Sequence, residues 1–171
     1  IADSYRLEQS GELLLSFRVR KMTMPDMHVF CKDVESSKEM CLKLHRKIYE
    51  EFGKLNHDLV CLYNLTKSFY EKNKEFFKEL ESIEKKPLLL RFVPENKYYW
   101  VVNVEHHIID KMKRPREIAT WQIDVGNAER FDIKFTDKDN KQKRPVIIHT
   151  AIIGTIERYI YSAFDYAIRQ K

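Results

Sequence analysis

Residues 5–30 read YRLEQSGELLLSFRVRKMTMPDMHVF, and the spacing of charges in this stretch decides the fold prediction. Three pairs of ionisable residues are each separated by a single residue: Arg6 and Glu8, Arg18 and Arg20, and Asp26 and His28. On an extended strand, residues i and i+2 point to the same face. We therefore predict antiparallel strands over residues 4–9 and 16–33, joined by a loop at Ser10 and Gly11, that present polar pairs to one side.

The chemistry of these pairs narrows the class of ligand. Three arginines beside a carboxylate favour a polyanion whose base or sugar is also recognised. Asp26 and His28 add recognition of a small cationic or metal-bound group. The competing interpretation is a solvated sheet face with scattered charges, which three pairs in so short a stretch disfavour. Pro25 predicts that the second strand is interrupted or bulged at that point.

The rest of the chain reads as a series of strands and helices. Residues 34–52 have apolar residues at close to helical spacing, and Gly53 takes the place of a C-cap glycine. A charged helix is predicted over residues 68–86, with an apolar stripe of Phe69, Phe76, Phe77 and Leu80. Further strands are predicted at residues 59–65, 88–92, 98–109, 117–125 and 146–152, a polar turn at 137–143, and a helix from Gly154 to about Arg169. Strands in runs with few βαβ units indicate the α+β class, with a mostly antiparallel sheet flanked by helices.

Composition predicts one domain over residues 1–171. Mixed charge and plentiful apolar residues argue against disorder, and a net charge of +5 permits an RNA partner without requiring one. Three cysteines, an odd number without CxxC spacing, argue against a disulfide framework and fit a cytoplasmic location. The sequence predicts neither a signal peptide nor a membrane-spanning run.

Residues 5–30 resemble motif 2 of the class II aminoacyl-tRNA synthetases, most closely the threonyl-tRNA synthetase family in its archaeal form. That motif is a strand with Arg-x-Glu, a loop rich in serine and glycine, and a returning strand with an arginine and, in this family, a histidine. Two later segments resemble the same family in the same order. Residues 116–131, REIATWQIDVGNAERF, resemble the strand and turn of the aminoacyl pocket, and residues 144–159, RPVIIHTAIIGTIERY, resemble motif 3. The resemblance implies the class II catalytic fold.

The resemblance also implies an ATP site. Arg6 would bind the α-phosphate and the attacking carboxylate, and Glu8 would accept a hydrogen bond from the adenine amino group. Arg18 would hold the far end of the bent triphosphate, and Arg158 would bind the γ-phosphate. Gly154 would let the nucleotide approach the backbone closely. Mg²⁺ would accompany ATP.

A zinc site for threonine is implied as well. His28 and His149 correspond to two of the family's Zn²⁺ ligands, and the third, a cysteine, is expected before residue 1. The chain by itself is therefore expected not to bind zinc tightly, and one tightly held zinc per chain would contradict this expectation. Asp26 would accept the threonine hydroxyl proton, and Thr120 and Gln122 would lie in the aminoacyl pocket or beside the ribose. Valine lacks that hydroxyl, so it would leave the metal and the carboxylate unsatisfied.

Several other residues receive a structural interpretation. The remaining histidines are not expected to bind metal: His45, His57, His106 and His107. Cys31 is expected to be a buried thiol. Glu117 should face away from Gln122 by strand parity. The aromatic residue of the pocket is either Tyr99 or Trp100.

The implied function is ATP-dependent activation of L-threonine to threonyl-adenylate and its transfer to tRNA(Thr), by a protein that is a homodimer at full length. No motif 1, editing domain or anticodon-binding domain is visible, so the chain is interpreted as part of the catalytic domain of a longer protein. The alternative is a non-catalytic, synthetase-derived paralogue or fragment that binds nucleotide or RNA. For Arg158 the alternative is a surface arginine paired with Glu157 or Asp165.

Overall fold

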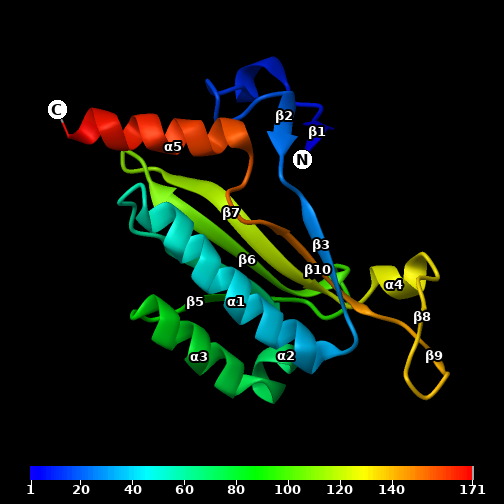
Figure 1. Ribbon diagram of the computed structural model, residues 1–171. Helices are drawn as coiled ribbons and strands as arrows, with labels where there is room; N and C mark the ends of the chain where they lie inside the picture. Colours follow the sequence, from blue (N-terminus) through cyan, green and yellow to red (C-terminus); the bar gives the residue numbers. More distant parts are fainter. Residues whose placement is uncertain (171) are drawn as a thin grey trace.

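A six-stranded sheet forms the centre of the computed structural model, which describes residues 1–170 (Figure 1). Its strands, in spatial order, are β3 (Met27–Cys31), β10 (Val146–Ala151), β7 (Pro115–Asp124), β6 (Trp100–Ile109), β4 (Val60–Thr66) and β5 (Leu89–Val93). All neighbours in this sheet are antiparallel except β4 and β5, which are parallel. The predicted α+β class with a mostly antiparallel sheet is confirmed.

Three helices cover one face of this sheet: α1 (Val34–Gly53), α2 (Lys67–Lys72) and α3 (Lys74–Glu84) (Figure 1). Asp33 caps the start of α1, because its carboxylate accepts a hydrogen bond of 2.8 Å from the Ser36 main-chain N–H. The C-cap prediction for Gly53 is wrong, since Gly53 is the last helical residue and the left-handed conformation falls at Asn56. The single charged helix predicted over residues 68–86 is two helices. Asn73 separates them, with its side-chain amide donating to the Phe69 carbonyl.

Alternation along the central strands gives the sheet one dry face and one polar face. On β6, Val102, Val104 and Ile108 are fully buried under the helices, while Asn103 and Glu105 between them are only partly buried. This period of two places successive side chains on opposite faces. The polar face is therefore the one available for a functional site.

The N-terminal segment forms a separate two-stranded sheet from β1 (Ala2–Tyr5) and β2 (Lys21–Met24), with the 3₁₀ helix η1 (Ser10–Glu12) in the loop. The single strand predicted over residues 16–33 is wrong, because β2 and β3 belong to different sheets. Pro25 lies between them and has no N–H with which to continue a ladder. The first two of the charged pairs therefore lie on loop segments rather than on strands.

The last helix, α5 (Ile156–Arg169), lies beside this N-terminal hairpin and contacts β2 and β7 (Figure 1). The short helix α4 (Asn127–Arg130) and a small hairpin of β8 (Phe135–Thr136) and β9 (Gln142–Lys143) project near the other end of β10 (Figure 1). Within residues 1–170, no helix has both the length and the apolar composition needed to cross a bilayer.

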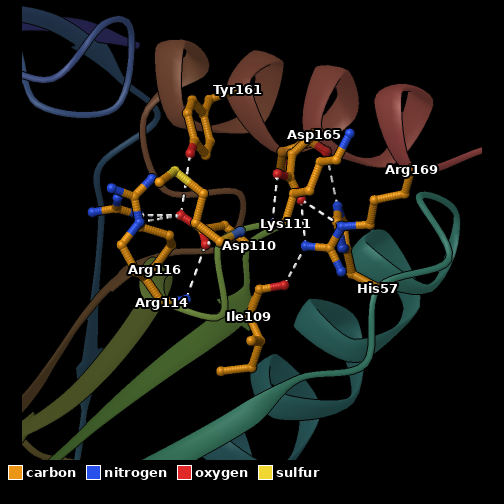
Figure 2. A network of polar contacts seen from close by, with 11 residues as sticks. His57, Ile109, Asp110, Lys111, Arg114, Arg116, Tyr161, Asp165 and Arg169 are labelled. Carbon is orange, nitrogen blue, oxygen red and sulfur yellow. Dashed lines mark hydrogen bonds and ion pairs between the residues drawn. The ribbon is translucent and has the colours of Figure 1, made fainter. Parts of the chain in front are cut away.

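A polar network connects α5 to the turn between β6 and β7 (Figure 2). Asp110 Oδ2 accepts hydrogen bonds of 2.9 Å from both Arg114 Nε and Arg116 Nε, and Tyr161 of α5 reaches the same oxygen. Asp165 accepts from the Lys111 main-chain N–H and pairs with Arg169. Burial of Asp110 opposes its ionisation, but hydrogen bonds from Arg114 and Arg116 outweigh this and lower its pKa to about 2.

Replacement of Asp110 with asparagine is expected to lower the free energy of unfolding by roughly 3 kcal/mol near neutral pH, because it leaves paired guanidinium groups without their carboxylate. The folded pKa of about 2 lies below the usual 3.8, so this stabilisation is present above pH ~4 and is lost as the pH falls through about 2. Urea unfolding of both chains across this range measures the difference. Asp132→Asn, which removes exposed pairs with Lys134 and Arg144, is the matched control and should cost less than ~1 kcal/mol. A pH-independent difference for Asp110→Asn would contradict this account.

Candidate active site

Four of the predicted ATP-site residues come together between the N-terminal hairpin and the start of α5. A small pocket there is lined by Arg6, Glu8, Phe17, Arg18, Val19, Met22, Thr155 and Arg158. Arg6 is exposed, whereas Glu8 is nearly buried. The loop and the helix are far apart in sequence, so this gathering of three arginines is a property of the fold.

Glu8 and Arg18 form an ion pair inside this group. Arg18 Nε donates to Glu8 Oε2 at 3.0 Å, and the guanidinium NH2 lies 2.9 Å from the same oxygen. This hydrogen bond lowers the pKa of Glu8 and raises the pKa of Arg18. Arg20 donates from Nε to the Glu8 main-chain carbonyl and so supports the loop. In this state the Glu8 carboxylate and the Arg18 guanidinium neutralise each other.

The guanidinium of Arg158 is held from three sides. Its Nε donates to the Phe17 carbonyl at 3.1 Å, its NH1 donates to the Glu117 carbonyl at 3.0 Å, and it lies 4.6 Å from the centre of the Phe17 ring. Burial lowers the pKa of Arg158, but an arginine stays cationic in proteins. The alternative pairing of Arg158 with Glu157 or Asp165 is wrong.

The two acids named in that alternative have other partners. The Glu157 carboxylate accepts from the Thr23 main-chain N–H at 2.9 Å, and Asp165 belongs to the network with Arg169. Arg158 therefore faces the pocket.

A bulge in β7 brings Glu117 to Arg158. In the β6–β7 ladder His106 pairs with Ala119 but His107 pairs with Glu117, so Ile118 is the extra residue. An extra residue reverses the parity of the strand beyond it. The carboxylate of Glu117 accordingly reaches to 3.6 Å from Arg158 NH1. The simple alternation used to orient Glu117 from the sequence fails because of this bulge.

Gly154 is required by the backbone. Its φ is +64°, and a Cβ at this position would lie 1.9 Å from the Ile118 carbonyl oxygen. Only glycine fits such a close approach with a positive φ. The neighbour at this close approach is Ile118, the bulged residue of β7, and the approach of a nucleotide to Gly154 stays a prediction.

His28 and His149 lie side by side on the polar face of the sheet. They are direct partners in the ladder between β3 and β10, and their ring centres are 4.6 Å apart. His149 Nε2 is 2.7 Å from Asp124 Oδ2. Burial opposes ionisation of Asp124, but hydrogen bonds from His149 and from the main chain at Asn127 and Gly126 lower its pKa. The Asp124 carboxylate thus orients the His149 ring.

Polar side chains of β6 and β7 continue this surface next to the two imidazoles. Asn103 Oδ1 accepts from Thr120 Oγ1 at 3.1 Å and from Gln122 Nε2 at 3.2 Å, and Gln122 Oε1 accepts from the Tyr99 hydroxyl at 2.7 Å. The Tyr99 ring lies 5.6 Å from the His149 ring. The pKa of Tyr99 is raised, first by burial and also by the nearby negative charges, among which is that of Asp26.

The two candidate pocket aromatics have different surroundings. Tyr99 lies at the polar surface, whereas Trp100 is buried and stacks on Tyr98 with ring centres 4.4 Å apart. Asp124 and Asn103 were assigned no role from the sequence. A signal for Asp124 was present, since an aspartate followed by Gly126 and Asn127 favours a turn in which the carboxylate accepts main-chain N–H groups, as it does here.

The predicted site residues thus form two groups on one side of the protein. The arginine group can bind a polyanion, and the imidazole group offers ring nitrogens of two histidines beside a supporting carboxylate. Cys31 contributes to neither, because it is buried, as predicted, and burial raises the pKa of its thiol.

A family model for the tRNA synthetase class II core domain (G, H, P, S and T) matches residues 1–166. The chain belongs to this family of class II aminoacyl-tRNA synthetase core domains. Its sequence is similar to Threonine--tRNA ligase of Thermofilum pendens, with 59% identity over 170 residues, and to that of Pyrobaculum neutrophilum, with 55% identity over 165 residues. The resemblance to archaeal threonyl-tRNA synthetases is therefore confirmed.

These matches cover 99% and 96% of the chain, but only 28% and 27% of the two relatives. The chain thus spans little more than a quarter of the length of the curated relatives it matches. In the solved structures, the RNA binding domain of threonyl-tRNA synthetase from Cryptosporidium parvum Iowa II matches with a TM-score of 0.79 and 23% identity, over 97% of this chain and 43% of that one. This match supports the predicted class II fold.

Proposed function

We propose that the protein containing this domain activates L-threonine with ATP, forms threonyl-adenylate, and transfers the threonyl group to tRNA(Thr). The observation that carries the proposal is the high identity to Threonine--tRNA ligases over nearly the whole chain, together with the two residue groups on one side of the domain. In this proposal the arginine group binds the nucleotide and the imidazole group binds the amino acid, the two substrates that must meet.

The arginine group is suited to adenylate formation. In this reaction the threonine carboxylate attacks the α-phosphate and pyrophosphate leaves, so negative charge increases at the phosphorus oxygens. Arg6 and Arg158 are the cations proposed to stabilise that charge, with Arg6 on the α-phosphate and Arg158 on the γ-phosphate. Because Arg158 is held by the Phe17 and Glu117 carbonyls, its guanidinium is positioned before ATP binds.

The proposed roles of Glu8 and Arg18 require their ion pair to open. In this proposal Glu8 binds the adenine amino group and Arg18 binds the distal phosphates. In the structure, however, the two side chains are paired with each other. Arg18 remains 44% exposed, so its side chain is free to turn towards a triphosphate. ATP with Mg²⁺ supplies the anionic partner that would replace Glu8, because phosphate binds a guanidinium with two donors.

The imidazole group can supply two of the protein ligands of a zinc ion. With His149 Nε2 bound to the Asp124 carboxylate, its Nδ1 is the nitrogen left for a metal, and this carboxylate–histidine arrangement is typical of zinc ligands. His28 is the second proposed ligand. Bound zinc would supply a Lewis acid that the threonine amino and hydroxyl groups can both reach. Asp26 is proposed to accept the hydroxyl proton, while Thr120 and Gln122 hold the aminoacyl end.

Threonine-dependent exchange of labelled pyrophosphate into ATP, measured on the protein at its full natural length, tests the proposal. We expect exchange with threonine and little with valine. Binding of ATP or RNA by a folded, zinc-loaded protein that catalyses no exchange would favour the alternative, a synthetase-derived binding module.

A further inference from the structure

A second group of metal-ligating side chains lies on the opposite, helix-covered face of the sheet. His45 of α1, Cys61 of β4 and His106 of β6 are all buried, and each offers a ligand atom within 4.8 Å of the other two. This group is distinct from the candidate active site. Trp121, which contacts His45, and Gln122, which lies at the active site, are neighbours on β7 and so point to opposite faces.

Hydrogen bonds alone do not satisfy this group. His45 Nδ1 has one lone pair and accepts from Trp121 Nε1–H at 3.3 Å, yet His106 Nε2 also lies 3.0 Å from the same nitrogen. His106 Nδ1 is buried and has no hydrogen-bond partner in the described part of the chain.

Charge in the same region is also unbalanced. Glu84 of α3 is almost completely buried, and its Oε1 accepts from the Tyr63 hydroxyl and lies 3.3 Å from His45 Nε2. Among the ion pairs of residues 1–170, no lysine or arginine pairs with Glu84. A buried carboxylate without a nearby cation is costly.

We propose that His45, Cys61 and His106 bind a structural zinc ion between the sheet and the helices α1 and α3. One ring nitrogen of His45, one ring nitrogen of His106 and the Cys61 sulfur are the ligands, and binding releases the thiol proton to solvent. The two charges of Zn²⁺ are then balanced by the Cys61 thiolate and the Glu84 carboxylate. Cysteine and histidine are the ligands that zinc prefers.

The surroundings support this assignment. The Glu84 carboxylate lies 3.3 Å from His45 Nε2, next to the ring that would hold the ion. Structural zinc sites are closed and four-coordinate. The fourth position is left to an oxygen, for which the Tyr49 hydroxyl, 3.4 Å from Cys61 Sγ, is the available side chain. Such an ion would join one helix and two strands, so binding it would stabilise the folded domain.

Zinc content of a chain carrying His149→Ala tests the proposal, because that replacement disables the imidazole pair at the active site. We expect about one zinc per chain after dialysis against a weak chelator. Adding Cys61→Ser should abolish zinc retention. Cys41→Ser is the matched control, since Cys41 is equally buried in the same core but lies outside the group, and it should retain the metal.

Cobalt substitution provides a second measurement that does not depend on the folding of the Cys61 variant. The His149→Ala chain reconstituted with Co²⁺ should show the sulfur-to-cobalt charge-transfer absorption of a thiolate ligand, and Cys41→Ser should leave it unchanged. Absence of this absorption in a folded chain would overturn the proposal. Equal zinc retention by folded Cys61→Ser and Cys41→Ser chains would overturn it as well.

Discussion

Replacement of Arg158 with lysine should lower kcat for threonine-dependent pyrophosphate exchange by about 100-fold, the loss typical of removing one preorganised group that stabilises transition-state charge. Lysine keeps the positive charge. It cannot, however, donate to the Phe17 and Glu117 carbonyls from two sides of a planar group while still facing a phosphate. The activity is thus expected to fall because the lysine ammonium is held in a different position and offers fewer hydrogen bonds to the phosphate, while the net charge is unchanged.

The control for this experiment is Arg116→Lys. Arg116 is buried to almost the same degree as Arg158 and lies over the same Phe17 ring, at 5.1 Å, but its guanidinium binds Asp110 on the outer network. Thermal unfolding of both variants separates loss of stability from loss of catalysis. Equal activity losses in the two variants would mean that Arg158 only supports Phe17, and the phosphate role would fail.

Regular hydrophobic periods made most of the fold predictable. The helix over residues 34–52 and the strand over 98–109 correspond to α1 and β6, because their buried residues recur at the helical and strand periods. The errors fall where single residues interrupt a period. At Pro25 the predicted single strand is interrupted, and its two halves belong to different sheets. At Asn73 the predicted single helix is divided into two. The bulge at Ile118 is set by pairing with β6, which no local pattern reports.

The candidate site was predictable only in part, and for a related reason. The proximity of His28 and His149 depends on the pairing of β3 with β10, which are separated by most of the chain. Only the resemblance to a known family brought these two residues together at the level of sequence. The ion pair of Glu8 with Arg18 depends on loop conformation, which strand parity does not describe.

The buried group of His45, Cys61 and His106 was missed for the same reason. Each residue lies in a segment with a clear apolar period, so each was predictable as buried. Their convergence arises only when α1 packs across β4 and β6. His45 and His106 are far apart in sequence and were therefore predicted to have a purely structural role, which the zinc measurements above would test.

His149→Ala should remove most of the discrimination between threonine and valine in pyrophosphate exchange by the full-length protein. A site that binds a substrate hydroxyl rejects the analogue without it by factors on the order of 10⁴ or more. The replacement removes one proposed zinc ligand, the imidazole ring that Asp124 orients. The factor should then fall to on the order of 10², as expected when an apolar pocket alone distinguishes two amino acids of nearly equal shape. The ratio of kcat/KM for the two amino acids is the measurement.

His107→Ala is the matched control, because His107 is a partly exposed histidine on the same sheet whose ring contacts the Glu105 carbonyl and not the imidazole pair. It should leave the ratio unchanged. Zinc content should fall by one ion per chain in His149→Ala only, which ties any loss of selectivity to this site and not to the ion proposed on the opposite face. Selectivity that survives the loss of His149 would mean that Asp26, Thr120 and Gln122 recognise the hydroxyl without a metal, and the zinc-assisted part of the proposal would be wrong.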